Sequence, residues 1–223
     1  KFSKVGKTTL QKFPNLKAVI SRGHGQDYVD EQLCNKAGVK VYRLNQYTES
    51  CAEWIADKIR SAPVLVYGMD GHVGSYLENI LTTKGIAHYG KNNDNTLPEN
   101  DVHTIVSCIP YDKKVYKHNE HFFNQEFFNQ FNNPVDFISI SRGPTHNNDD
   151  LIELLKNGKI KTAHIDTVDS HRRDELLAFD NFNYTEHSAW NHLPMVSGEL
   201  FYRLKRQIEI AGIIEGLKPK DQE

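Results

Sequence analysis

One stretch of the sequence, VLVYGMDGHVG at residues 64–74, limits the possible fold more than any other. Its four apolar residues predict a buried strand, and its three glycines predict a tight turn into a helix. A strand, a glycine-rich turn and a helix in this order are typical of a site for the phosphates of a dinucleotide. The spacing G-x-x-G-x-x-G is one residue longer than the usual G-x-G-x-x-G. A glycine-rich turn without a ligand therefore stays an alternative.

The rest of the chain alternates short apolar runs with helical patterns. We expect a short strand within residues 14–21 and further strands at 39–44, 64–67, 86–89, 104–108, 137–141, 162–165 and 183–185. We expect helices at 30–37, 49–60, 75–83, 149–157 and 199–214. Strands that alternate with helices predict a parallel, doubly wound sheet of the α/β class.

Ligands of such sheets bind beyond the carboxyl ends of the strands. The residues that follow the expected strands should therefore gather around one crevice: residues 68–74, Ile109, Pro110, Arg142, Asp166 and His187. An arginine, an aspartate and a histidine that converge there indicate a chemical site. An arginine paired with a surface acid, and one of eleven histidines in an ordinary polar loop, are the alternatives.

Composition excludes several classes of partner. The 27 basic and 29 acidic residues give a net charge of -2, which argues against a general nucleic-acid binder. No run approaches the ~18 apolar residues of a membrane span, and no secretory segment is visible. The three widely spaced cysteines predict free thiols in a reducing compartment, so we expect a cytoplasmic protein: Cys34, Cys51 and Cys108. No metal is expected, because the histidines that could meet at the crevice lack a ligand spacing: His24, His72, His171 and His187.

Five stretches carry a resemblance to a known family. Residues 15–30, NLKAVISRGHGQDYVD, are similar to N-L-K-x-I-x-R-x-G-V-G-x-D-N-I-D, and ESCAE at 49–53 is similar to E-S-V-A-E. Residues 138–169 are similar to I-N-x-A-R-G-x-x-V-D-x-x-A-L-x-x-A-L-x-x-G-x-I-x-G-A-x-L-D-V-F, and YTEHSAW to T-P-H-I-A-W. With the stretch at 64–74, they resemble the D-isomer-specific 2-hydroxyacid dehydrogenases, in the order of that family.

The resemblance implies an NAD(P)-dependent oxidoreductase that reduces a small 2-oxo acid to a D-2-hydroxy acid by hydride transfer. His187 would give the proton, Arg142 would clamp the substrate, and the turn at Gly23, His24 and Gly25 would hold the substrate carboxylate. A plain tight turn is the alternative for that loop. The residues that would bind the cofactor are Gly68, Gly71, His72, Val73, Gly74, Lys91, Asn92, Ile109, Pro110 and Asp166.

The resemblance also implies two domains in a Rossmann-like fold. Residues 61–196 would form the dinucleotide-binding domain, and residues 1–60 a small, truncated flavodoxin-like substrate domain completed by a helix at 197–223. Glu53 and Val64 are only 11 positions apart, where the family has several tens of residues that form much of its dimer contact. Either the chain is a trimmed member or residues are missing from it. The usual dimer is therefore not expected, and an oligomer of another kind is left open.

The choice of cofactor depends on residues after the second strand of the nucleotide-binding domain. Asn92 stands where an acid usually binds the ribose hydroxyls of NAD, and Lys91 lies beside it. No carboxylate there repels a 2'-phosphate, so NADP is weakly favoured over NAD. A solvated loop charge is the alternative for Lys91.

The catalytic pair shows the largest departure from the family. The family places a Glu five residues after the Asp matched by Asp166, where it bonds the catalytic His, and this chain has His171 there. Asp169 is the candidate replacement. Because a carboxylate partner favours the charged imidazole, we expect a weaker reductase with a more acidic pH optimum. The alternative is a dinucleotide-binding regulatory or interaction protein with weakened or lost catalysis.

Overall fold

A computed structural model of the chain describes residues 4–21, 28–43, 47–91 and 101–193. The chain divides into two compact units, and Thr48–Leu193 form the larger one. The described residues that precede Thr48 belong to the smaller unit. The predicted helices at 197–223 and 199–214 lie outside the described residues. Within the described ranges, no helix is both long and apolar enough to cross a membrane.

The smaller unit contains a two-stranded parallel sheet. Strand β1 (Ala18–Ser21) pairs with β2 (Lys40–Arg43), and helices α1 (Lys7–Lys12) and α2 (Glu31–Lys36) belong to the same unit. Asp30 caps α2 by accepting a hydrogen bond from the Leu33 amide at 3.0 Å. A small core forms around Val29, Cys34 and Val39.

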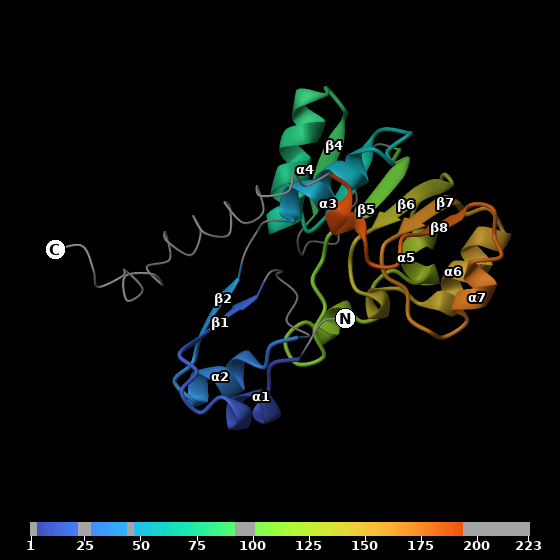
Figure 1. The fold of residues 1–223 in the computed structure, drawn as a ribbon. Helices are drawn as coiled ribbons and strands as arrows, with labels where there is room; N and C mark the ends of the chain where they lie inside the picture. Colours follow the sequence, from blue (N-terminus) through green and yellow to red (C-terminus); the bar gives the residue numbers. More distant parts are fainter. Residues whose placement is uncertain (1–3, 22–27, 44–46, 92–100, 194–223) are drawn as a thin grey trace. The chain divides into compact units, whose positions relative to one another are not determined.

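The larger unit is built on six parallel strands in the order β4-β3-β5-β6-β7-β8 (Figure 1). Their bounds are β3 (Val64–Tyr67), β4 (His88–Lys91), β5 (Thr104–Ser107), β6 (Val135–Ser139), β7 (Ile160–Ile165) and β8 (Phe182–Tyr184). The strand order reverses at β3, which has β4 on one side and β5 on the other. The predicted parallel, doubly wound sheet is thereby confirmed, and its ligand crevice is expected at the carboxyl ends of β3 and β5.

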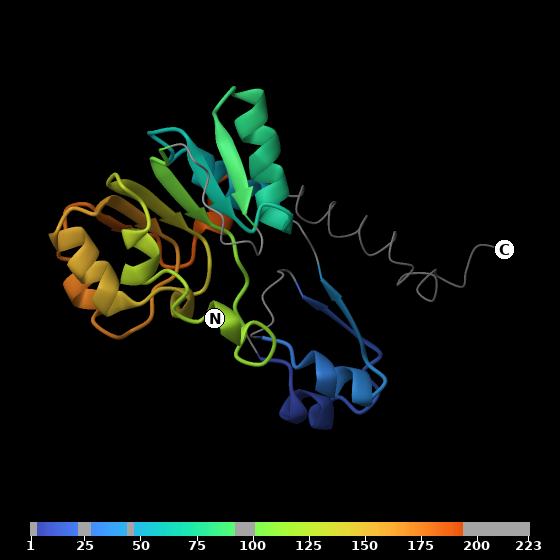
Figure 2. The ribbon, with the colours of Figure 1, turned by 180° about the vertical axis from the view of Figure 1, so that it is seen from behind.

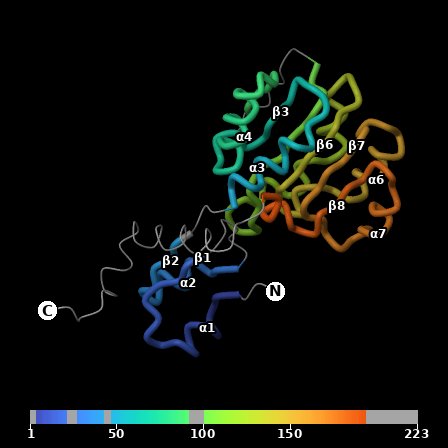
Figure 3. Tube along the Cα trace, turned by 45° about the horizontal axis from the view of Figure 1, so that its top comes forward, coloured from blue at the N-terminus to red at the C-terminus, as the bar shows by residue number. Residues whose placement is uncertain are grey.

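Helices cover both faces of this sheet because its strands are apolar on both sides (Figures 1 and 2). Helices α3 (Thr48–Ala56) and α4 (His72–Thr83) pack on the face that presents Val64, Val66 and Val106. The other face is covered by α5 (Gln125–Asn129), α6 (Asn148–Lys156) and α7 (Arg173–Leu176). Figure 3 traces the strands between the two groups of helices. Three short 3-10 turns complete the unit: η1 (Lys117–Asn119), η2 (Gly143–Thr145) and η3 (Ala189–Asn191).

Among the predicted bounds that differ from the structure, two differ for identifiable reasons. The strand expected at 86–89 is β4 at 88–91, because its pairing with β3 begins at His88 opposite Val64, while Ile86 packs with the core below α4. The helix expected from Ser75 begins at His72, since Gly71 takes the N-cap position. The turn and the helix therefore overlap within the glycine-rich stretch.

The imidazole of His146 is an unusual core group. It is 2% exposed and lies beside the rings of Phe123 and Phe137, and its Nε2 bonds the Ser139 hydroxyl at 2.7 Å. Its Nδ1 has no hydrogen-bond partner of good geometry in the described part of the chain. Burial lowers the pKa of His146 to about 3, and the main chain of Gly143 opposes this only in part. The folded protein therefore holds a neutral histidine.

This histidine predicts acid sensitivity of the fold. In the unfolded chain a histidine titrates near ~6.5, so its stabilising effect is complete above that pH and declines as the pH falls towards about 3. The expected contribution is up to ~1.4 kcal/mol of unfolding free energy per pH unit. Urea unfolding between about pH 7 and pH 5 measures this slope. His146→Val should have a shallower slope than the wild type, and equal slopes would contradict the assignment.

Candidate active site

The glycine-rich stretch has two structural features of a phosphate-binding turn despite its extra residue. Gly68 has a φ of +84°, and a Cβ there would lie 3.0 Å from the Cys108 carbonyl carbon, so only glycine fits this tight turn. A Cβ on Gly74 would lie 2.1 Å from the Gly68 oxygen, so the first turn of α4 packs directly on the turn. Gly68 therefore forms the tight turn after β3, and the Met69 side chain that follows it is buried.

The amino end of α4 is the part of this turn that faces a ligand in related sheets. Gly71 is its N-cap and supplies no side-chain hydrogen bond, and the Gly71 amide donates to the Gly68 oxygen at 3.0 Å. The first-turn amides come from His72, Val73 and Gly74. A helix N-terminus with a bare glycine cap suits a phosphate group, because its amides and its dipole both favour an anion.

The neighbouring strand ends bring further predicted residues to the same edge of the sheet. Lys91 ends β4, is only 7% exposed, and its carbonyl accepts the Gly68 amide at 2.9 Å. Ile109 is buried, and Pro110 is exposed after β5. Lys91 is thus part of the sheet rather than of a solvated loop. Asn92, and the turn at Gly23, His24 and Gly25, lie outside the described residues.

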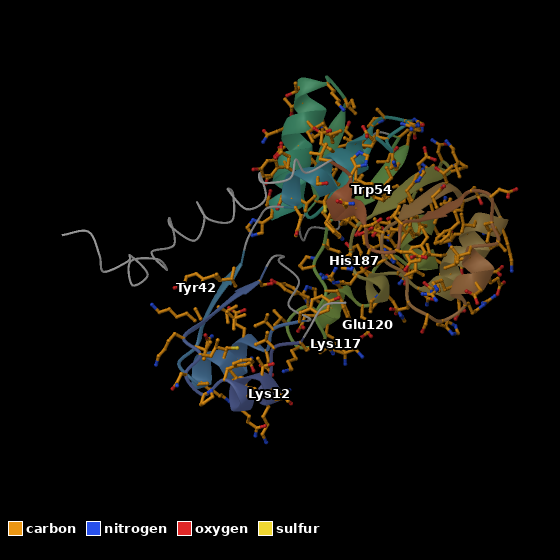
Figure 4. The ribbon with its side chains drawn as sticks, in the orientation of Figure 1. Lys12, Tyr42, Trp54, Lys117, Glu120 and His187 are labelled. Atoms are coloured by element: carbon orange, nitrogen blue, oxygen red, sulfur yellow. The ribbon has the colours of Figure 1, made fainter. Side chains whose placement is uncertain are left out.

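Arg142 and His187 meet although they are 45 residues apart. Arg142 follows β6 at the start of η2, and His187 follows β8, where Figure 4 labels it. The Arg142 Nη1 donates to the His187 Nε2 at 3.0 Å. A guanidinium group has no acceptor atom, so Nε2 accepts this bond and carries no proton in this arrangement. The structure therefore shows a cation that donates a hydrogen bond to an unprotonated nitrogen of an imidazole.

Asp166, at the end of β7, holds the loop that carries His187. Its Oδ1 accepts the Thr185 hydroxyl at 2.6 Å and the amides of Ser188 and Ala189 at 2.8 and 2.9 Å, and Asp166 is 3% exposed. Its main-chain oxygen accepts the His187 amide at 2.6 Å. His187 and the residue before it have positive φ angles of 61° and 52°. Such conformations cost on the order of 1–3 kcal/mol each, so the loop needs this support.

The ESCAE motif explains a second support of the same loop. Ser50 on α3 is buried, its Oγ donates to the Ala189 oxygen at 3.4 Å, and it accepts the Leu193 amide at 2.9 Å. Beyond η3, His192 Nε2 lies 2.7 Å from the Asp57 carboxylate. Helix α3, on which Figure 4 labels Trp54, therefore anchors the segment that follows His187.

Asp169, the candidate acidic partner of His187, and His171, at the family's glutamate position, both lie in other surroundings. Asp169 packs against Gly143, where its carboxylate would be 2.6 Å from an added Cβ, and this carboxylate makes no hydrogen bond within the described residues. Although this side chain reaches solvent, partial desolvation, together with the charge of Glu120, raises the pKa of Asp169, and His121 and Lys113 oppose this. The side chain of His171 is 66% exposed and lies 3.1 Å from the Asp149 carboxylate.

Helix α6 holds the segment that carries Asp169 and His171. Asn148, at the start of α6, is buried, and its Nδ2 donates to the main-chain oxygens of Asp169 at 3.3 Å and His171 at 2.5 Å. Arg172 forms a 2.8 Å ion pair with Asp149 on the same surface. These contacts turn the His171 side chain towards α6. Across the described ranges, no three His, Cys, Asp or Glu side chains form a group that could hold a metal.

A comparison with protein families gives one match. The family described as D-isomer specific 2-hydroxyacid dehydrogenase, NAD binding domain, matches residues 36–189, which is more than half of the 223 residues. A comparison with curated proteins finds no match.

Solved structures of similar fold include three informative ones. The D-lactate dehydrogenase of Aquifex aeolicus, complexed with NAD and lactic acid, has a TM-score of 0.69 at 19% identity, covering 96% of this chain and 80% of its own. An acyclic imino acid reductase in complex with NADPH and D-Arg has a TM-score of 0.74 at 16% identity, covering 95% and 81%. The NADPH-dependent glyoxylate/hydroxypyruvate reductase of Sinorhizobium meliloti, in complex with NADP and malonate, has a TM-score of 0.64 at 20% identity, covering 85% and 73%.

Proposed function

The chain belongs to the D-isomer specific 2-hydroxyacid dehydrogenase family, and from this we propose that it reduces a small 2-oxo acid to a D-2-hydroxy acid with a nicotinamide dinucleotide. The contact between Arg142 and His187 at the carboxyl ends of β6 and β8 carries the proposal. It joins a fixed cation to a group that exchanges protons near neutrality. A 2-oxo acid needs both, since its carboxylate and its keto oxygen must be bound and the oxygen must receive a proton.

Arg142 would bind the substrate in place of its present partner. Its planar guanidinium offers two parallel donors to a carboxylate or to a carboxylate and a keto oxygen. A substrate that draws these donors away from the His187 Nε2 leaves that nitrogen ready to take up a proton. Substrate binding and proton uptake would therefore be coupled through one hydrogen bond.

His187 would then donate the Nε2 proton to the keto oxygen. The bound nicotinamide would supply the hydride to the keto carbon, so the carbonyl becomes a hydroxyl group. Positioned acid catalysis of this kind contributes typically 10²–10⁴-fold to a rate, which makes His187 the residue on which turnover most depends. The proposed turn at Gly23–Gly25 would add main-chain donors to the substrate carboxylate.

The proposed cofactor contacts begin at the phosphate-binding turn formed by Gly68, Gly71 and Gly74 and extend to Ile109 and Pro110. Lys91 at the end of β4 favours the 2'-phosphate of NADP, as inferred from the sequence. The relatives are divided on this point, since the A. aeolicus enzyme is complexed with NAD and the S. meliloti enzyme with NADP. Glyoxylate and hydroxypyruvate are the substrates to test first.

The proposal is tested by following NADPH and NADH oxidation with each 2-oxo acid across about pH 5 to 8, a range that brackets the ~6.5 of an ordinary histidine. Turnover with a faster rate for NADPH supports the reductase and the assigned role of Lys91. Absence of turnover, with NADPH binding still detected by fluorescence, would instead favour the dinucleotide-binding regulatory protein. The Asp169 carboxylate packs against Gly143 and makes no hydrogen bond in the described part of the chain. Because it does not support the charged form of His187 there, we expect a slow enzyme with an acidic pH optimum.

A further inference from the structure

A buried group of three serine hydroxyls and one imidazole lies at the carboxyl ends of β5 and β6. Ser107 and Ser139 are 0% exposed, Ser141 is 4% exposed and His146 is 2% exposed. The hydroxyls of Ser107 and Ser141 are 2.6 Å apart, and His146 bonds Ser139 at 2.7 Å. Hydroxyl groups are costly to bury, so a set of four bonded polar groups in a core indicates a specific task.

These groups fix the main chain on both sides of Arg142. The Ser141 amide donates to the Ser139 hydroxyl at 3.2 Å, and the Thr167 hydroxyl donates to the Ser141 oxygen. The Arg142 oxygen accepts both the amide and the hydroxyl of Thr145, at 2.9 and 2.7 Å. The position of the arginine is therefore set by its neighbours before any substrate arrives.

The hydroxyl of Ser141 also reaches the proposed cofactor side of the site. It donates to the Ile109 oxygen at 2.8 Å, so it joins the loop after β5 to the loop after β6. Ile109 is one of the proposed cofactor contacts, and Arg142 is the proposed substrate clamp. One buried hydroxyl thus sets the distance between the elements that would hold the two reactants.

Three members of this group differ together from the family signature given above. The signature has Asn, Ala and Val where this chain has Ser139, Ser141 and His146. An asparagine side chain carries both a donor and an acceptor group. The Ser139 side chain is shorter, and its hydroxyl is hydrogen-bonded to the imidazole of His146. Where the signature has one asparagine, this chain has a hydrogen-bonded network of Ser107, Ser139, Ser141 and His146.

We propose that Ser141 is a positioning residue for Arg142, acting through its hydrogen bonds to Ser107 and to the Ile109 carbonyl. The proposal rests on the proposed function in one respect, that Arg142 binds the substrate carboxylate. Removing the hydroxyl retains the arginine side chain and the cofactor turn, but it releases the link between the two loops and lets Arg142 shift. Substrate affinity should then fall while cofactor affinity does not.

Ser141→Ala tests this, with Thr162→Val as the matched control. This control removes a part-buried hydrogen bond of 2.6 Å from the Thr162 hydroxyl to Asp136, in the same sheet but at the other end of its strands. Each variant is measured for the melting temperature, the dissociation constant of NADPH, kcat and KM for the 2-oxo acid, and calorimetric binding of oxamate to the NADPH complex. A displaced clamp should weaken oxamate and lower kcat/KM about tenfold in Ser141→Ala.

The outcomes separate this inference from the proposed function. Weaker oxamate binding in Ser141→Ala, with NADPH affinity within about twofold and no such change in Thr162→Val, supports the positioning role. A Ser141→Ala variant that only melts earlier, as the control does, overturns it. The triple variant Ser139→Asn, Ser141→Ala, His146→Val restores the signature and should recover affinity. A wild type that neither binds oxamate nor turns over would refute the proposed function, and the positioning role with it.

Discussion

Replacing His187 by Ala is expected to lower kcat for 2-oxo acid reduction by a factor on the order of 10³, with little change in NADPH affinity. The reason is that the His187 imidazole, a group suited to proton transfer, is in contact with the proposed substrate clamp Arg142. The rate that remains should lose its decline towards alkaline pH, because the group that must be protonated is gone. Steady-state kinetics across about pH 5 to 8 give both results.

His171→Ala is the matched control for this variant. His171 occupies the family's glutamate position, but its side chain is exposed and paired with Asp149. Its removal should change kcat by less than about twofold, the size of effect expected of an exposed ion pair. If instead His171→Ala lowered kcat as strongly as His187→Ala, His171 would have a catalytic role, and its pairing with Asp149 would not be the arrangement used in turnover. Unchanged turnover in His187→Ala would remove His187 from the mechanism.

Periodicity predicted the core of the larger unit well where strands are buried on both faces. The run at 64–67 has no polar residue to shift its bounds, and β3 occupies those residues. The edge strand β4 was misplaced because its residues are mostly polar or glycine, and only pairing with β3 sets its register. Helices α5 and α7, of 5 and 4 residues, are shorter than any periodic pattern can reveal.

The candidate site could be predicted only as far as strand ends determine it. The rule for parallel sheets placed Arg142, Asp166 and His187 at one edge. In the structure, Arg142 donates to the His187 imidazole, and the His187 amide donates to the Asp166 main-chain oxygen. The direction of His171 depends on the buried Asn148, which carries no sequence pattern of its own. The Ser141 network was missed for the same reason, although three departures from the family signature in eight residues were a usable signal.

Replacing Asp166 by Ala is expected to lower kcat by about 10²-fold and to lower the melting temperature. Oδ1 accepts three hydrogen bonds from the loop that carries His187, and bonds to a charged group are worth ~1.5–3 kcal/mol each. Without them, His187 and its neighbour have less reason to keep their left-handed conformations, and the imidazole leaves the Arg142 side chain. Kinetics and thermal unfolding of the purified variant test both effects.

Asp166→Asn and Thr185→Val separate this loop-holding role from a direct contact with the cofactor, which the family resemblance implies for Asp166. Asparagine keeps one carbonyl oxygen, which can accept the same three donors, so this variant should recover most of kcat. Thr185→Val removes one of the three donors and should lie between the wild type and Asp166→Ala. If Asp166→Asn is instead as impaired as Asp166→Ala, and both weaken NADPH binding, the carboxylate acts on the cofactor. Because Oδ1 is already saturated by three protein donors, we expect the loss to appear in kcat.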